Sequence, residues 1–235
     1  MPALKRIGHK GADLIAPGNT LASFDAALSA GVDMVEFDVL TEHRDGSGRL
    51  VLAHDFDAVA RSETLTLEQG LAHFAQDAWE GIELDVDLKT SGYELRVIEA
   101  LREYGLADRA LVSTMEVDSL RAIRAAAPEI RLGWSVPKLR RNYLANPFTR
   151  VPAWAGVEYL RLKLPARAAG AIREGRVDAV MSHWALVTPR LVRAIEQAGG
   201  ELYVWTVDDA TRIAKLDALG VTGIITNDPR LFATA

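Results

Sequence analysis

Short hydrophobic runs alternate with amphipathic stretches along the whole chain. Residues 82–89, with the sequence IELDVDLK, alternate apolar and charged side chains. Such strict alternation predicts a β-strand with two unlike faces. Asn19-Thr20 before residues 21–30, and Gly31 after them, are typical of the two ends of an α-helix.

Eight strand-like segments follow one another in this way, with helical patterns between them. The strands are expected at residues 6–9, 34–40, 82–89, 110–113, 131–136, 178–181, 201–207 and 223–226. The helices are expected at residues 21–30, 67–78, 93–104, 117–126, 189–198 and 210–219. Strands that alternate with helices indicate a parallel sheet, and eight of them favour closure. We therefore predict an α/β fold, a single (β/α)8 TIM barrel domain over residues 1–235.

Two segments depart from this alternation. Residues 49–53 form a further short strand and predict a small insertion after the second barrel strand. Residues 137–176 carry four prolines and a basic aromatic run at 138–143, so we expect a long excursion with short helices after the fifth strand. Its aromatic side chains fit either a surface loop packed by its own residues or an apolar wall beside a site.

Composition narrows the class of ligand. The net charge is −5 and charged residues make up 25% of the chain, which gives no reason to expect a nucleic-acid surface or a cationic membrane anchor. There are no cysteines, which excludes disulfides and thiolate metal sites. No apolar run reaches the roughly 18 residues of a membrane span, so we expect a cytoplasmic protein without an integral membrane segment. The oligomeric state stays open.

Polar residues fall where the predicted strands end. In a TIM barrel the reactive groups gather at the C-terminal ends of the strands. The residues selected by this rule are His9, Lys10, Glu36, Asp38, His54, Asp87, Lys89, Ser113, His183, Trp205, Asn227 and Asp228. Three of the five histidines are among them, which points to one reactive rim.

Three of these acids form a candidate metal site. Glu36 and Asp38 are two residues apart, so in a strand they project to the same side. On its own this pair also fits an exposed edge strand. With Asp87 it offers three carboxylates to one divalent ion, Mg²⁺ or Ca²⁺, although Asp85 on the same face competes for that role.

The remaining residues indicate phosphate chemistry. Lys10 and Lys89 supply fixed positive charge beside the predicted ion, and His9 and His54 suit general acid and base catalysis. Trp205 is a candidate ligand platform at the end of its strand, although a tryptophan is more often part of the core. Together these groups predict cleavage of a small-molecule phosphodiester.

The same residues resemble the motifs of the glycerophosphodiester phosphodiesterases. The family pattern runs H-R-G, P-E-N-T-L-x-A-F, G-x-D-x-x-E-x-D-V-x-x-T-x-D-G, V-x-x-H-D, E-x-K, W-T-V-N and G-I-I-T-D-x-P. The matching segments here are His9 to Gly11, Pro17 to Phe24, Gly31 to Thr41, Leu52 to Asp55, Asp87 to Lys89, Trp205 to Asp208 and Gly223 to Pro229.

The resemblance implies a role for each matching position. His9 and His54 correspond to the paired acid-base histidines, and Glu36, Asp38 and Asp87 to the ligands of one Mg²⁺ or Ca²⁺ ion. Lys89 corresponds to a phosphate contact and Trp205 to the wall near the glycerol moiety. The implied products are sn-glycerol 3-phosphate and an alcohol. The nucleophile stays open between water and a neighbouring substrate hydroxyl, and the latter would pass through a cyclic phosphate.

Three residues depart from the family pattern. Lys10 replaces arginine, Asp87 replaces glutamate, and Gly18 replaces the glutamate of P-E-N-T. These changes leave two alternatives beside the leading hypothesis: a lysophospholipase D-like activity on lysolipids, and a catalytically silent barrel that binds a phosphorylated ligand or a protein partner.

Overall fold

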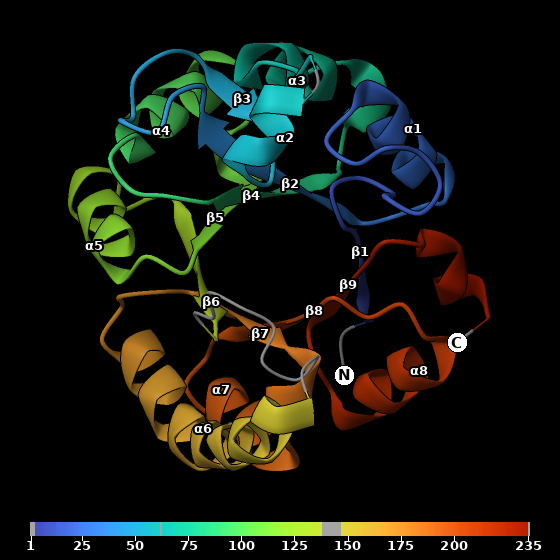
Figure 1. The fold of residues 1–235 in the computed structure, drawn as a ribbon, viewed down its shortest axis with the longest axis vertical. Helices are drawn as coiled ribbons and strands as arrows, with labels where there is room; N and C mark the ends of the chain where they lie inside the picture. The colour runs from blue at the N-terminus through green and yellow to red at the C-terminus, as the bar shows by residue number, and fades with distance from the viewer. Residues whose placement is uncertain (1–2, 62, 138–146, 235) are drawn as a thin grey trace.

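Eight parallel strands close into a barrel in the computed structural model, which describes residues 3–61, 63–137 and 147–234, with the side chains of 147–155 left aside. The strands are β1 (Lys5–Gly8), β2 (Met34–Thr41), β4 (Glu83–Leu88), β5 (Ala110–Thr114), β6 (Arg131–Val136), β7 (Ala179–His183), β8 (Glu201–Trp205) and β9 (Gly223–Thr226). Strand β1 pairs with both β2 and β9, so the sheet closes on itself (Figure 1). The prediction of a TIM barrel is confirmed.

Helices surround the barrel on all sides (Figure 1). They are α1 (Leu21–Ser29), α2 (Phe56–Arg61), α3 (Leu67–Phe74), α4 (Glu94–Glu103), α5 (Val117–Ala126), α6 (Pro147–Arg173), α7 (Pro189–Glu196) and α8 (Ala210–Leu219), with short 3-10 turns at Asp77–Trp79, Ala107–Arg109, Trp184–Leu186 and Pro229–Ala233. Thr20 caps α1 by accepting from Ser23 N, as its sequence position suggested. Among the described residues, no helix combines the length and apolar character needed to cross a membrane.

The small insertion after β2 is present. Strand β3 (Leu50–Leu52) pairs antiparallel with the end of β2, and the short helix α2 follows it. The sequence pattern did not predict α2, whose six residues carry no buried side chain. The insertion places His54 just after β3, the strand that pairs with the end of β2.

The excursion after β6 differs from its prediction. We expected short helices in residues 137–176, but Pro147–Arg173 is one continuous helix of 27 residues. Its later part is rich in alanine, leucine and arginine, which are strong helix formers. Leu164, Ala168 and Ile172 recur at helical spacing and are buried against the barrel, so packing supports the helix despite Pro165. The basic aromatic run at 138–143 lies outside the described residues.

The inside of the barrel is layered. At the N-terminal ends of the strands, Lys5 lies 2.5 Å from Glu83, and Arg131 bridges Glu83 at 2.6 Å and Glu201 at 2.5 Å. Above this ionic layer lies an apolar cluster formed by Ile7, Met34, Leu111, Ala179, Met181, Tyr203 and Ile225. These two layers fill the lower barrel, so the open cavity is confined to the C-terminal mouth.

The ionic layer should contribute to stability. Arg131→Met removes the cation between two carboxylates whose side chains are only 26% and 32% exposed. We expect the free energy of unfolding to fall by about 2–3 kcal/mol, because Glu83 and Glu201 would lose a shared partner. The control Arg121→Met removes only an exposed ion pair with Asp118 and should change it by less than about 0.5 kcal/mol. Equal urea denaturation midpoints for the two variants would contradict this account.

Candidate active site

A cavity of about 160 Å³ opens at the C-terminal mouth of the barrel. Its lining comprises His9, Glu36, His54, Asp85, Asp87, Lys89, Ser113, Met115, Ser135, Met181, Trp205, Thr206 and Ile225. Segments far apart in the sequence therefore meet here, as predicted from the ends of the strands. None of the described α6 side chains lines this cavity.

Strand β2 turns its acids inward because its other face is apolar. Phe37 is fully buried on the outer face and packs against Phe24 and Phe74, with ring centroids 6.1 and 5.2 Å away. Since side chains alternate along a strand, Glu36 and Asp38 must point into the barrel. The burial of the outer face thus fixes the position of the two carboxylates.

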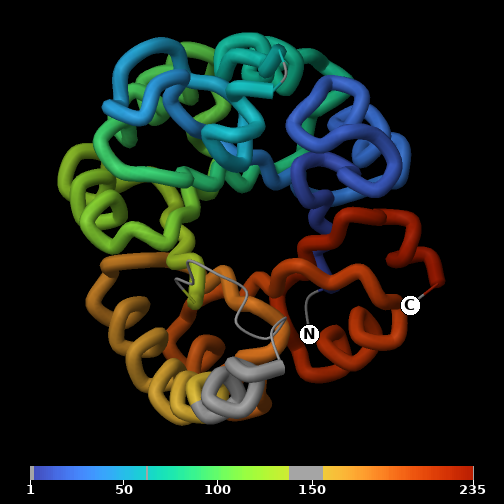
Figure 2. Tube along the Cα trace, in the orientation of Figure 1, coloured from blue at the N-terminus to red at the C-terminus, as the bar shows by residue number. Residues whose placement is uncertain are grey.

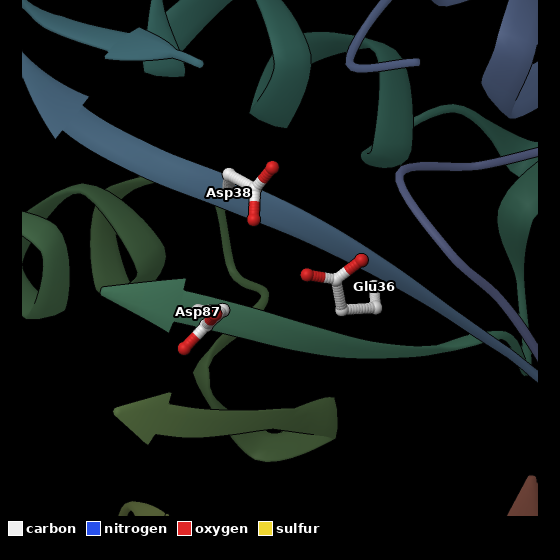
Figure 3. A group of neighbouring side chains, drawn as sticks. All are labelled: Glu36, Asp38 and Asp87. Atoms are coloured by element: carbon white, nitrogen blue, oxygen red, sulfur yellow. The ribbon is translucent and has the colours of Figure 1, made fainter. Parts of the chain in front are cut away.

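The predicted metal ligands come together in space. The register of β2 on β4 places Asp38 beside Asp87. One carboxylate oxygen of each of Glu36, Asp38 and Asp87 lies within 4.8 Å of the others (Figure 3). Three oxygens at this spacing are a suitable donor set for a hard divalent cation.

Lys89 lies among these acids. Its ammonium contacts both Asp38 and Asp87. Although burial opposes its charge, the neighbouring carboxylates of Asp38, Asp87 and Glu36 raise the pKa of Lys89 well above its usual value. Lys89 therefore stays protonated. Three carboxylates beside one ammonium would carry a net negative charge when all are ionised, and a divalent ion would balance it.

The carboxylates differ in their protonation. Burial, followed by repulsion from Asp38, raises the pKa of Glu36 well above its usual value. Burial would raise the pKa of Asp38, but the charge and hydrogen bond of Lys89, together with His54 and His9, lower it below its usual value. Burial raises the pKa of Asp87, and Lys89 opposes that effect. Asp38 is thus the acid that most favours the ionised form.

Asp85 is the fourth inward acid and lies deeper. It is 1% exposed and accepts a hydrogen bond from Ser113 Oγ at 2.7 Å. Burial and the nearby charge of Asp87 raise its pKa to about 8. The oxygens that cluster with Glu36 and Asp38 belong to Asp87. The geometry therefore favours Asp87 over Asp85 as the third ligand.

Asn19 is a site residue that the sequence analysis did not select. Its Nδ2 donates to Asp38 Oδ2 at 2.9 Å, and its Oδ1 accepts from Asp38 N at 3.1 Å. Asn19 has a positive φ of 59°, a conformation that asparagine tolerates better than most residues. The asparagine of the P-E-N-T motif could have revealed it, had it been considered as more than part of a helix cap.

The two predicted histidines lie in unlike surroundings. The His9 side chain is 19% exposed and its Nε2 lies 3.8 Å from Glu36 Oε2. Burial lowers the pKa of His9, so it is neutral near pH 7. The His54 side chain is 57% exposed at the mouth, with Nδ1 3.4 Å from Asp55 Oδ2. One histidine is therefore enclosed and the other is open to solvent.

Trp205 forms part of the wall. Its indole Nε1 donates to Met181 O at 2.9 Å, and the ring of His183 meets it edge-on at 5.2 Å. His183 Nδ1 accepts from Ala185 N at 3.2 Å. His183 thus supports the tryptophan from the next strand.

Comparison with known proteins identifies the family. The model of the glycerophosphoryl diester phosphodiesterase family matches residues 9–66 and 72–231. The chain belongs to this family. Membership confirms the resemblance seen in the motifs, and it confirms the prediction of an enzyme of the phosphoric diester hydrolase class.

Individual members of the family are distant relatives. A glycerophosphodiester phosphodiesterase of Caldanaerobacter subterraneus subsp. tengcongensis is 26% identical and covers 95% of this chain and 93% of its own length. The glycerophosphodiester phosphodiesterase GDPD4 of Arabidopsis thaliana is 25% identical, and the match covers 95% of this chain and 70% of that protein.

Solved structures share the fold. A glycerophosphodiester phosphodiesterase from Agrobacterium tumefaciens superposes with a TM-score of 0.71 at 21% identity, covering 99% of this chain and 98% of that one. An Oleispira antarctica phosphodiesterase, solved with the product sn-glycerol-3-phosphate, also has a TM-score of 0.71 at 21% identity. The match covers 98% of this chain and 96% of that one.

Two departures from the family motifs meet in the loop after β1. Lys10 Nζ pairs with Asp13 Oδ2 at 3.0 Å, and Gly18 N donates to Asp13 Oδ1 at 2.8 Å. A Cβ on residue 18 would approach Asp13 Oδ1 to 2.6 Å. Asp13 therefore supplies a carboxylate beside the glycine. The backbone N of Lys10 donates to Glu36 Oε2 at 2.8 Å, while its side chain lines a second cavity next to the first.

Asn19 should stabilise the site through Asp38. Asn19→Gly keeps the positive φ without strain, but the buried Asp38 loses one hydrogen bond on its carboxylate and one on its backbone N–H. We expect the free energy of unfolding, measured with urea in the presence of chelator, to fall by about 1–3 kcal/mol. Asn19→Ala should cost roughly 1 kcal/mol more, because alanine disfavours positive φ. Wild-type stability in Asn19→Gly would refute a supporting role for this side chain.

Proposed function

We propose that this protein hydrolyses glycerophosphodiesters to sn-glycerol 3-phosphate and an alcohol, using one divalent cation and two histidines. The observation that carries the proposal is the meeting of Glu36, Asp38 and Asp87 with His9 and His54 at one barrel mouth. Family membership supports the reaction class. The named activities of the relatives, and the glycerol phosphate bound by the Oleispira enzyme, support the substrate.

The donor set fits a hard ion. Glu36, Asp38 and Asp87 would hold Mg²⁺ or Ca²⁺, because both ions prefer carboxylate oxygens. When bound, the ion would withdraw electron density from the phosphate and stabilise its growing negative charge. Lys89 adds a positive charge that its neighbours keep protonated. Lys10 lines the second cavity, where its ammonium pairs with Asp13 and would add positive charge for the substrate.

The surroundings of the histidines suggest how protons move. His9 is buried and its lowered pKa favours the neutral imidazole, so it is suited to take the proton from the attacking hydroxyl. That hydroxyl belongs to water, which gives glycerol 3-phosphate directly, or to a neighbouring substrate group, which gives a cyclic phosphate that water then opens. His54 is open to solvent and would protonate the departing alkoxide. Trp205 would cover the glycerol moiety, because an aromatic face suits an uncharged group.

The departing alcohol has a second cavity available to it. This cavity measures about 450 Å³ and shares His54 with the first, so the two lie on either side of the proposed acid. Lys10, Asp13, Ala58 and Glu63 contribute to its lining. We place the alcohol here, because an alcohol leaving past His54 enters this space.

The alternatives have less support. The lysophospholipase D hypothesis depended on aromatic residues of the excursion: Tyr143 lies outside the described residues, as do the side chains of Phe148 and Trp154, and Tyr159 is 61% exposed. The silent-barrel hypothesis leaves the enclosed His9 beside Glu36 without a purpose. The single-domain organisation and the cytoplasmic location remain predictions.

Turnover should depend on both the ion and His54. Release of glycerol 3-phosphate from sn-glycero-3-phosphocholine should stop with chelator and return with Mg²⁺ or Ca²⁺.

His54→Ala should lower kcat roughly 100- to 10,000-fold, the usual contribution of a general acid. His43→Ala is the control, since His43 lies exposed in a turn away from both cavities. An undiminished rate in His54→Ala would rule out its assigned role.

The second cavity can be tested by its size. Ala58→Trp should lower kcat/KM for the choline ester roughly ten-fold, because the indole occupies the space of the alcohol. The rate with sn-glycero-3-phosphomethanol should be spared, since methanol needs little room. Ala60→Trp, on the same helix but outside the cavity, is the matched control. Equal losses with both esters would remove the alcohol from this cavity.

A further inference from the structure

We propose that Asp208 and Asn227 form a positioning relay, which fixes the hydrogen of His9 on Nδ1 and leaves the lone pair of Nε2 facing the cavity. Neither residue lines the cavity, and both act through His9. The relay rests on the proposed role of His9 as the base. It goes beyond that role by assigning which nitrogen reacts and which residues determine it.

The first step of the relay orients the Asn227 amide. Asp208 Oδ2 accepts from Asn227 Nδ2 at 2.7 Å, and Asp208 Oδ1 accepts from Asn227 N at 2.8 Å. Thr226 Oγ1 donates to the same Oδ1 at 3.0 Å. An ionised carboxylate only accepts hydrogen bonds, so the NH₂ of Asn227 must face Asp208. The amide oxygen must then face the other way.

The second step fixes the imidazole. Asn227 Oδ1 lies 2.6 Å from His9 Nδ1. An amide oxygen has no hydrogen to give, so Nδ1 must donate. In a neutral imidazole the other nitrogen then holds the lone pair. That nitrogen is Nε2, 3.8 Å from Glu36 Oε2, on the side where the substrate would lie.

The backbone holds the relay in place. His9 N donates to Thr226 O at 2.8 Å, and Leu14 N donates to Asn227 O at 3.0 Å. Asn227 is therefore bound on its N–H, its C=O and both ends of its amide. A residue held at four points has little freedom to turn its amide over. The tautomer of His9 is thus a consequence of tertiary structure.

An uncharged amide next to His9 distinguishes this relay from a direct carboxylate contact. The negative charge of Asp208 is one residue removed from the imidazole, so it orients the ring without pairing with it directly. Exchange of the two side chains should keep the hydrogen bonds and reverse the direction of only one, the bond between residues 208 and 227. An amide at 208 would donate to a carboxylate at 227, which would still accept from Nδ1.

The tautomer can be observed directly by ¹⁵N NMR of the full-length Mg²⁺-loaded protein, at a pH where the imidazole is neutral. The resonances of His9 are those lost in His9→Gln. We expect the Nδ1–H form in the wild type, and a gain of the Nε2–H form in Asn227→Leu. The Nε2–H form in the wild type would overturn the relay. This readout needs no turnover, so it separates failure of the relay from failure of the proposed function.

Kinetics with sn-glycero-3-phosphocholine give a second readout. Asn227→Leu should lower kcat roughly ten-fold or more and leave KM within about two-fold, because the base is misoriented while the binding groups remain. Asp209→Asn is the control, since Asp209 caps α8 through Arg212 N and asparagine caps equally well. It should keep the wild-type kcat.

The reciprocal exchange excludes a merely structural role. Asn227→Asp alone places a carboxylate against Asp208 and should lower kcat. Addition of Asp208→Asn should restore most of the lost rate and the Nδ1–H form. A double variant that folds but stays as slow as Asn227→Asp would overturn the proposal. If the double variant does not fold, the wild-type spectrum decides.

Discussion

The structure of the site depends on the register between β2 and β4. That register pairs Glu36 with Asp85 and Asp38 with Asp87, so four carboxylates face the inside of one barrel. Such a concentration of buried acid opposes folding unless each group finds a partner. Lys89 pairs with Asp38 and Asp87. Asn19 also donates a hydrogen bond to Asp38, and Ser113 donates one to Asp85. These partners allow the acids to be buried beside the cavity.

The lower barrel makes that concentration of charge tolerable. The ionic layer of Lys5, Glu83, Arg131 and Glu201 pairs its charges internally at the other end. The apolar cluster around Met181 and Tyr203 separates the two polar layers. Acids at the mouth therefore interact chiefly with one another and with Lys89. This isolation explains why Asp85, the deepest of them, has a pKa raised to about 8 by burial.

Sequence patterns predicted the parts that depend on local periodicity. Alternation along β2 and β4 revealed which acids share a face, and the rule for barrel strands gathered His9, Lys89 and Trp205 at one rim. The pattern did not reveal Asn19 or the contact of Asn227 with His9, because these bonds join residues 19 and 218 positions apart. It also missed the continuity of α6, where burial of one face overrides the proline signal. Tertiary contacts decide all three.

Closure of the barrel links folding to chemistry. His9 follows the first strand and Asn227 follows the last, and the pairing of β1 with β9 brings them together (Figure 2). The contact between His9 and Asn227 therefore forms only when the two ends of the sheet have met. The loop after β1 carries this further, since Leu14 binds Asn227 while Lys10 and Asp13 border the second cavity. A substitution that loosens β9 would thus disturb His9 without touching the acids on β2. In this barrel neighbouring strands determine the position of the acid cluster, whereas closure of the sheet determines the surroundings of His9.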